Sequence, residues 1–276
     1  MKLGIVTIPT AAQATGPRAI IDRVVEFGTR AERLGFEGLW ITDSFARGHA
    51  SVDPLAVLAA LCGVTSRIEL GTCVAQVPLR HPVEHAHRAQ TLNLLSGGRF
   101  RFGVGSGSTK HDFDAVQVDY DKRFKMLPEY LAVMRRVWAG EPVHGPALTV
   151  WPGTEGGPPV LLGAWRSARW IDLAARHCHG WIASGIYSAW DDLPIGIGMY
   201  RAAGGKRVVL ANIFTDLRPA PDDHPLIARS KITLVCGKAE ARDRLRRLED
   251  MGVDDALLIL PFGAPDQLEE VRGLLD

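Results

Sequence analysis

Short apolar runs alternate with longer stretches of helical periodicity along most of the chain. The run at 3–8 predicts a strand, and apolar residues spaced by three and four positions over 20–34 predict a helix. The alternation continues to the last residues. It predicts further strands at 38–42, 68–74, 99–105, 160–163, 180–184, 208–214 and 256–260. It predicts further helices at 53–64, 81–95, 122–138, 167–177, 190–203, 238–251 and 266–275.

Eight strands, most of them followed by a helix, divide the 276 residues into units of about 34 residues. Such alternation favours parallel strand pairing with the helices outside the sheet. Because no linker interrupts it, the pattern predicts one α/β domain over 1–276, a single (β/α)₈ TIM barrel, rather than two doubly wound domains. Two stretches, 140–159 and 217–231, are predicted as short insertions, the first with a hairpin around 148–151.

The composition is that of an ordinary globular protein, with 46% hydrophobic and 23% charged residues. Thirty-two Lys and Arg against 31 Asp and Glu leave a net charge of +1, which gives no electrostatic case for a nucleic-acid or membrane partner. No apolar run approaches the roughly 20 residues of a membrane span. The cysteines are scattered and the N-terminus is typical of a strand rather than a signal peptide, so we expect a cytoplasmic protein.

In a barrel of this type, functional residues follow the carboxyl ends of the strands. The residues at those positions are mainly apolar or carry hydroxyl groups, whereas a metal-dependent hydrolase needs clustered His and Asp. His81 and His85 lie four residues apart on a predicted helix, but His87 faces another direction and no carboxylate cluster accompanies them. The sequence therefore predicts no metal site.

The glycine-rich stretch 103–108 resembles a nucleotide-binding loop only in part. A dinucleotide fingerprint starting at Gly103 requires glycine at 108, where serine stands, and the Gly-Lys-Ser/Thr of a phosphate loop is absent. A sharp turn at a strand end explains the glycines, and such a turn still lets the backbone approach a ligand closely.

Five segments, taken together, resemble the bacterial luciferase-like monooxygenase family. They are AERLGFEGLWITDSF, DPLAVLAALCGVTSRIELGTCVAQVPLRHPVEHAHRAQTLNLLSGGRFRFGVGSG, RFKMLPEYLAVMRRVWAGEPV, VLLGAWRSARWIDLAARHCHGWIASG and TLVCGKAEARDRLRRLEDMGVDDALLIL. The resemblance implies a TIM barrel with an insertion region, which binds FMN or the deazaflavin coenzyme F420 at the carboxyl ends of the strands. It also implies a homodimer. The family includes flavin monooxygenases and deazaflavin-dependent dehydrogenases and reductases.

The resemblance implies three groups of cofactor-binding residues. A strand with a non-proline cis peptide between Cys73 and Val74 would support the isoalloxazine ring, and a serine-glycine loop would line the cofactor. A turn at a helix start, with free N–H groups, a guanidinium and a hydroxyl, would bind the phosphate, and this chemistry suits an anion. The residues are Thr72, Cys73, Val74, Ser106, Gly107, Ser108, Gly163, Ala164, Trp165, Arg166, Ser167 and Ser184.

The sequence departs from the family at the predicted catalytic pair, Asp43 and Ser44. Many members have histidine where Ser44 stands, and serine has no pKa near neutrality for proton transfer. Ser108 also stands where some deazaflavin enzymes have an acid. Both departures favour a monooxygenase that uses reduced FMN and O₂ on a small organic substrate, with a separate flavin reductase. Two alternatives remain: deazaflavin-dependent hydride transfer, and a flavin-binding protein without catalysis.

Overall fold

The computed structural model describes residues 1–7, 16, 18–48, 50–164, 167–219, 225–260 and 267–275. All eight predicted strands are present there, with bounds within two residues of the predictions, and two short strands are added. The strands are β1 (Lys2–Thr7), β2 (Gly38–Ile41), β3 (Glu69–Thr72), β4 (Ala75–Gln76), β5 (Phe100–Gly105), β6 (Val160–Gly163), β7 (Gly180–Ser184), β8 (Val208–Asp216), β9 (Leu234–Val235) and β10 (Asp255–Ile259).

The predicted helices are present as well, and two short ones, α4 and α8, were not predicted. The α-helices are α1 (Ala19–Leu34), α2 (Pro54–Cys62), α3 (Pro82–Leu95), α4 (Lys110–Ala115), α5 (Arg123–Trp138), α6 (Ala168–His177), α7 (Asp192–Ala202), α8 (Pro225–Arg229), α9 (Lys238–Asp250) and α10 (Gln267–Arg272). Two 3₁₀ turns are η2 (Val77–Leu79) and η3 (Tyr120–Lys122). Residues 140–159 contain neither helix nor strand, so the hairpin predicted around 148–151 is wrong.

The strand order shows the fold class. Hydrogen bonds link the strands in the order β10–β1–β2–β3–β5–β6–β7–β8–β9, with β4 beside β5. Strand β10 pairs in parallel with both β1 and β8, so the order returns to its start. The fold is the predicted (β/α)₈ barrel. Within the described ranges, no helix is long and apolar enough to span a lipid bilayer.

The chain divides into two compact units. Unit 1 comprises Met1–Thr7, Phe27–Trp40 and Val160–Asp276, and unit 2 comprises Ile8–Glu26 and Ile41–Pro159.

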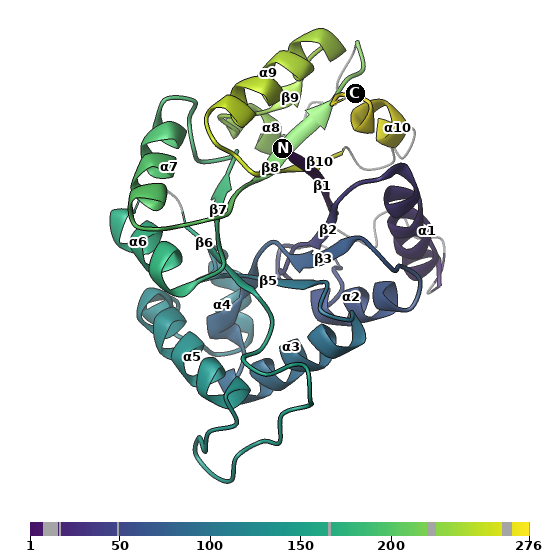
Figure 1. The fold of residues 1–276 in the computed structure, drawn as a ribbon. Coiled ribbons are helices and arrows are strands. Elements are labelled where there is room, and N and C mark those ends of the chain that lie inside the picture. Colours follow the sequence, from purple (N-terminus) through teal and green to yellow (C-terminus); the bar gives the residue numbers. More distant parts are fainter. Residues whose placement is uncertain are drawn as a thin grey trace. The chain divides into compact units, whose positions relative to one another are not determined.

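In unit 1, strands β6, β7 and β8 lie side by side with α6 and α7 against them (Figure 1). Every residue of β7 and β10 is buried, as expected for parallel strands covered on both faces. Trp181 of β7 lies under α7, where a Cβ on Gly196 would approach its ring to 2.7 Å. Its indole N–H donates to the carbonyl of Ala164 at 2.6 Å. Glycine at 196 therefore lets α7 pack closely on the indole.

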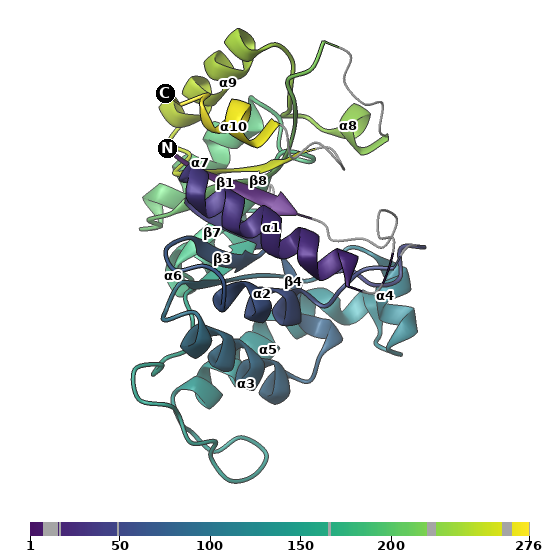
Figure 2. The ribbon, with the colours of Figure 1, turned by 90° about the vertical axis from the view of Figure 1, so that its right-hand side faces the viewer.

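In unit 2, α3 packs against both α2 and α5 (Figure 2). Phe102 of β5 contacts the Trp138 ring edge to face, with the ring centroids 6.3 Å apart. The Trp138 indole N–H donates to the carbonyl of Ala86 at 2.9 Å. This aromatic cluster joins the sheet to both long helices.

His85 of α3 belongs to the same core. Its side chain is fully buried, its ring lies edge to face on Phe102 at 5.2 Å, and neither ring nitrogen has a hydrogen-bond partner within the described structure. Burial lowers the pKa of His85 to about 3, helped by the positive charges of Arg80 and Arg88 and opposed by Asp53. The imidazole is therefore a neutral core group at physiological pH.

This burial predicts a pH-dependent stability. The unfolded chain binds a proton at position 85 below about pH 6.5, whereas the folded chain does not until about pH 3. The free energy of unfolding should thus fall by up to about 1.4 kcal/mol per pH unit as pH drops through that window. Replacing His85→Leu should remove this slope in urea unfolding followed between pH 7 and 4. The exposed neighbour provides the control, because His87→Leu should retain the wild-type slope. An unchanged slope in His85→Leu would contradict a neutral buried imidazole.

Candidate functional site

In unit 2, predicted site residues follow the carboxyl ends of β3 and β5. The amide of Cys73 donates to the carbonyl of Ile41 at 2.8 Å, and the hydroxyl of Thr72 donates to the carbonyl of Gly103 at 2.6 Å. The Cys73–Val74 peptide is cis, as the resemblance predicted. A Cβ on Gly105 would lie 2.6 Å from Val74 Cγ2, so glycine at 105 allows this close packing. Burial raises the pKa of the Cys73 thiol to about 12, which keeps it protonated and unreactive.

A buried ion pair anchors the loop after β2. Asp43, whose side chain is 1% exposed, accepts two hydrogen bonds from the guanidinium of Arg80, at 2.6 and 2.9 Å. Arg80 also contacts Asp53 at 3.3 Å, the residue that caps α2 through the amide of Ala56. Burial alone would lower the pKa of Arg80, but the hydrogen bonds and charge of Asp43, with Asp53, raise it above its ordinary value. The guanidinium therefore stays charged, and the bidentate geometry fixes the Asp43 carboxylate.

Gln76 of β4 links this ion pair to helix α4. Its amide nitrogen Nε2 donates to the carbonyl of Asp43 at 2.9 Å and to Asp112 Oδ2 at 2.8 Å. The other Asp112 oxygen accepts from the backbone amides of Phe45 and Ala46 at 3.2 and 2.8 Å. Burial would raise the pKa of Asp112, but these hydrogen bonds, led by that from Gln76, and the charge of Arg47 lower it. The Asp112 carboxylate is thus ionised in the folded protein.

Three residues of this network were missed by sequence reasoning. Arg80 and Gln76 lie inside a segment that carries the family resemblance, but nothing in the local pattern distinguishes Gln76 from a surface residue. Asp112 lies in a helix of six residues, too short for its periodicity to be recognised. A signal for Arg80 does exist, because Pro78 and Pro82 mark a rigid turn around it.

The predicted Ser44 and the loop at 106–108 lie beside this network. Ser44 Oγ is buried and has no hydrogen-bond partner among the described residues, while its carbonyl accepts from the Ser51 hydroxyl. Gly107 has φ +85°, and a Cβ there would lie 2.5 Å from Gln76 Oε1. Ser106 is half-buried and Ser108 exposed, with the Ser108 carbonyl accepting from the hydroxyl of Tyr120 at 3.2 Å.

The remaining predicted residues belong to unit 1, except that Trp165 and Arg166 lie outside the described residues. Ser184, at the end of β7, accepts a hydrogen bond from the Asn212 amide at 3.2 Å. Gly163 ends β6, and the amide of Ala164 donates to the carbonyl of Ile182 at 3.1 Å.

Ser167 stands at the N-cap of α6, and its side chain makes no capping hydrogen bond. The first turn of α6 has no acidic residue and includes Arg169. Helix α7 differs, because Asp191 and Asp192 occupy its start. Since a helix N-terminus attracts anions and acidic side chains repel them, α6 is the better phosphate acceptor of the two.

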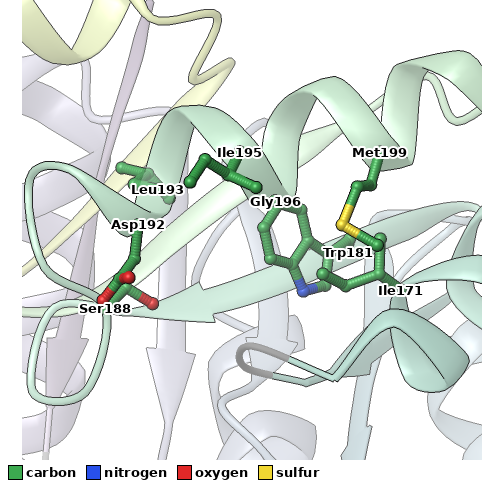
Figure 3. A pocket seen from close by; sticks show the side chains of 8 residues that line it. All are labelled: Ile171, Trp181, Ser188, Asp192, Leu193, Ile195, Gly196 and Met199. Atoms are coloured by element: carbon green, nitrogen blue, oxygen red, sulfur yellow. The ribbon is translucent and has the colours of Figure 1, made fainter.

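A cavity of about 210 Å³ lies between α6 and α7. Figure 3 shows the oxygen atoms of Ser188 and Asp192 together at one end, and Trp181, Ile171 and Met199 toward the other. The acidic end makes this cavity unsuitable for a phosphate. Over the part of the chain that the structure describes, no three His, Cys, Asp or Glu side chains are grouped to hold a metal ion.

Comparison with known proteins identifies the family. The model of the luciferase-like monooxygenase family matches residues 1–212. The chain belongs to this family.

The relatives of this luciferase-like chain include a monooxygenase and an F420-dependent dehydrogenase. The chain is 31% identical over 166 residues to 4-hydroxyprotoasukamycin monooxygenase of Streptomyces nodosus subsp. asukaensis, covering 56% of this chain and 45% of that protein. It is 33% identical over 144 residues to an F420-dependent glucose-6-phosphate dehydrogenase of Amycolatopsis mediterranei, covering 49% and 41%. The chain thus spans less than half the length of these two relatives.

Solved structures share the fold. A monooxygenase from Streptomyces bottropensis aligns with a TM-score of 0.82 and 20% identity over 100% of this chain and 97% of that one. The oxygenating constituent of 3,6-diketocamphane monooxygenase from Pseudomonas putida, in complex with FMN, aligns with a TM-score of 0.74 and 15% identity, covering 100% and 95%. The proteins similar to this chain thus include monooxygenases, one of them solved in complex with FMN, and an F420-dependent dehydrogenase.

The ion pair of the luciferase-like site predicts a large loss of stability when one partner is removed. Arg80→Leu leaves the buried Asp43 carboxylate uncompensated, so the free energy of unfolding should fall by about 3–5 kcal/mol in urea titrations. The added change Asp43→Asn removes the unpaired charge and should restore about 1–2 kcal/mol.

Arg136→Leu is the matched control, because the Arg136–Glu141 pair is half exposed, at 53% for each side chain. It should cost about 1 kcal/mol or less. An equal loss for Arg80→Leu and Arg136→Leu would contradict the buried-pair assignment.

Proposed function

We propose that the protein is a monooxygenase that uses reduced FMN and O₂ to oxidise a small organic substrate. The observation that carries this proposal is the arrangement of Asp43 and Ser44, where the protein offers fixed charge and a hydroxyl rather than a histidine. Both carboxylate oxygens of Asp43 accept hydrogen bonds from Arg80, and Oδ2 accepts a further hydrogen bond from the backbone N–H of Gln76. Such a carboxylate is an anchor for the loop rather than a mobile proton acceptor.

The residues present fit a flavin mononucleotide. Ser167 offers a hydroxyl that makes no capping hydrogen bond, and the N-terminus of α6 has no competing acid in its first turn, which suits the phosphate. Arg166, carried over from the family resemblance, would neutralise its charge. The family resemblance assigns the ring to the segment Thr72–Val74 and the lining of the cofactor to Ser106–Ser108, and it gives Ser184 as a further cofactor-binding residue; these assignments stay predictions.

When bound, reduced FMN supplies the electrons that activate O₂. The chain's own residues then have three tasks. The network around Asp43 keeps the loop after β2 in place, the Cys73 thiol stays protonated and inert, and Ser44 can donate or accept one hydrogen bond. None of these tasks requires a titrating base, in keeping with a reaction in which the cofactor performs the redox chemistry.

Deazaflavin-dependent hydride transfer is the second candidate, and the relationship to F420-dependent glucose-6-phosphate dehydrogenase favours it. A catalytically inactive flavin carrier is the third. The expected homodimer and the separate flavin reductase accompany the first candidate and stay predictions.

Binding and turnover distinguish these candidates. The purified protein should bind FMN in absorbance and fluorescence titrations, and it should consume O₂ with externally reduced FMN in the presence of a substrate. Preferential binding of F420, with reduction of F420 or of a substrate under anaerobic conditions, would replace the first candidate by the second. FMN binding without turnover across a panel of small ketones, aldehydes and aromatic compounds would favour the third.

The proposed phosphate site predicts a selective effect on ligand affinity. Charge-assisted hydrogen bonds contribute about 1.5–3 kcal/mol each, so Arg166→Ala should weaken FMN binding by about tenfold to a hundredfold. Ser167→Ala should weaken it by about threefold to tenfold, because the neutral hydroxyl donor that is lost contributes less than a charged guanidinium. Riboflavin, which lacks the phosphate, should be affected much less by both changes.

Arg176→Ala provides the matched control, because Arg176 lies in the last turn of the same helix and pairs with Asp172 at 2.7 Å. The Arg176→Ala variant should bind FMN with the same affinity as the wild type. Equal losses for FMN and riboflavin in Arg166→Ala would mean that Arg166 supports the fold instead of the phosphate.

A further inference from the structure

The side chain of Gln76 joins three segments of unit 2 that are distant in sequence. The residue is 3% exposed, and Nε2 donates to the Asp43 carbonyl and to Asp112 Oδ2, at 2.9 and 2.8 Å. Because both partners are oxygen atoms that can only accept, the amide must present its NH₂ group to them. Its oxygen then lies beneath Gly107, where an added Cβ would approach to 2.5 Å.

Asp112 extends the connection. Its second oxygen accepts from the amides of Phe45 and Ala46, so a path of hydrogen bonds runs from β4 through α4 to the loop after β2. The backbone amide of Gln76 closes the path, because it donates to Asp43 Oδ2 at 2.9 Å. One neutral side chain therefore ties together the loops that follow β2 and β5.

We propose that Gln76 is a positioning residue that pre-forms the cofactor-binding surface by holding the loop at 43–46 and the segment at 106–115 in one arrangement. The effect on cofactor affinity rests on the proposed function, whereas the effect on the two segments does not. Gln76 acts through Asp43, Asp112 and Gly107, and its role requires a neutral group that donates two hydrogen bonds.

Charge explains why an amide is required at this position. Among the described residues, the network includes the carboxylates of Asp43, Asp112 and Asp53 and the guanidinium groups of Arg80 and Arg47. The titratable group next to them is the imidazole of His85, which interacts electrostatically with Arg80 and Asp53 and is neutral at the pH values used below. A carboxylate at position 76 would face the Asp43 carbonyl and the Asp112 carboxylate, and none of these three groups can donate. A protonated carboxyl could donate one hydrogen bond and restore part of the connection.

This requirement gives Gln76→Glu a pH-dependent defect that a simple packing role would not produce. In cofactor-free protein at pH 8, deuterium exchange at 43–48 and 106–116 should be at least about tenfold faster than in the wild type at the same pH. At pH 5.5, protonation of the introduced carboxyl should reduce this difference to about threefold or less. Gln76→Leu should show the fast exchange at both pH values.

Gln90→Glu is the matched control. Gln90 is also a buried glutamine of unit 2, 4% exposed, and its amide donates to the hydroxyl of Thr154 at 3.1 Å. The Thr154 hydroxyl already donates its one hydrogen to the carbonyl of Trp151 at 2.8 Å, so a carboxylate at 90 also faces an oxygen that is not free to donate, but this contact involves neither of the two segments. This variant should leave exchange at 43–48 and 106–116 unchanged at both pH values.

A second-site variant keeps the test valid if Gln76→Leu does not fold. Combining Gln76→Glu with Asp112→Asn reverses donor and acceptor across the contact. At pH 8, exchange at 43–48 and 106–116 in this double variant should be at least about threefold slower than in Gln76→Glu alone. FMN affinity, measured on the same proteins, should follow the exchange data.

The proposal would be overturned if Gln76→Glu exchanged at the wild-type rate at pH 8. It would also be overturned if Gln76→Glu exchanged equally fast at both pH values and the added change Asp112→Asn did not slow the exchange. Wild-type protein that binds neither FMN nor F420 would overturn the proposed function alone, because the exchange experiment needs no cofactor.

Discussion

The contact between Arg80 and Asp43 is the constraint on which the rest of unit 2's site depends. Two opposite charges buried together gain little net stability, but either charge alone in that environment would be costly. The folded state must therefore place both charged groups in contact with each other. The turn at η2 brings Arg80 there, and the end of β2 brings Asp43. With Asp43 fixed in this way, its Oδ2 and its backbone carbonyl lie at defined places, and Gln76 donates a hydrogen bond to each.

The hydrogen bonds of Gln76 and Asp112 extend that constraint to backbone that has no regular structure. Phe45 and Ala46 belong to a loop, and their amides would otherwise need water as partner. Asp112 satisfies both amides with one oxygen, and its pKa is lowered by the hydrogen bond from Gln76 together with those from the two amides, which favour the charged form against the effect of burial. Glycine at 107 completes the arrangement, because any side chain there would displace the Gln76 amide. The shape of the loops thus follows from a few polar contacts rather than from apolar packing.

The same distinction explains what could be predicted from the sequence. Strands such as β7 and β10 are buried along their whole length, so they appear as contiguous apolar runs that pattern analysis locates well. The cis bond at Cys73–Val74 was predictable from resemblance alone, since no local chemistry distinguishes that bond from its neighbours. The polar network was not predictable, because Asp43, Gln76 and Asp112 meet only in the folded chain. The predicted roles of Trp165 and Arg166 stay predictions.

The chemistry open to this site follows from which groups are fixed and which are free. Asp43 is held by Arg80 and Gln76, and the Cys73 thiol stays protonated because burial raises its pKa to about 12. The Ser44 hydroxyl has no hydrogen-bond partner among the residues that the structure describes, and it can orient a group but cannot serve as a base at neutral pH. Under the proposed function, these residues would position a bound cofactor and substrate, and none of the three is a base at neutral pH. A reaction driven by the redox chemistry of the cofactor fits these residues better than one that needs an enzyme base.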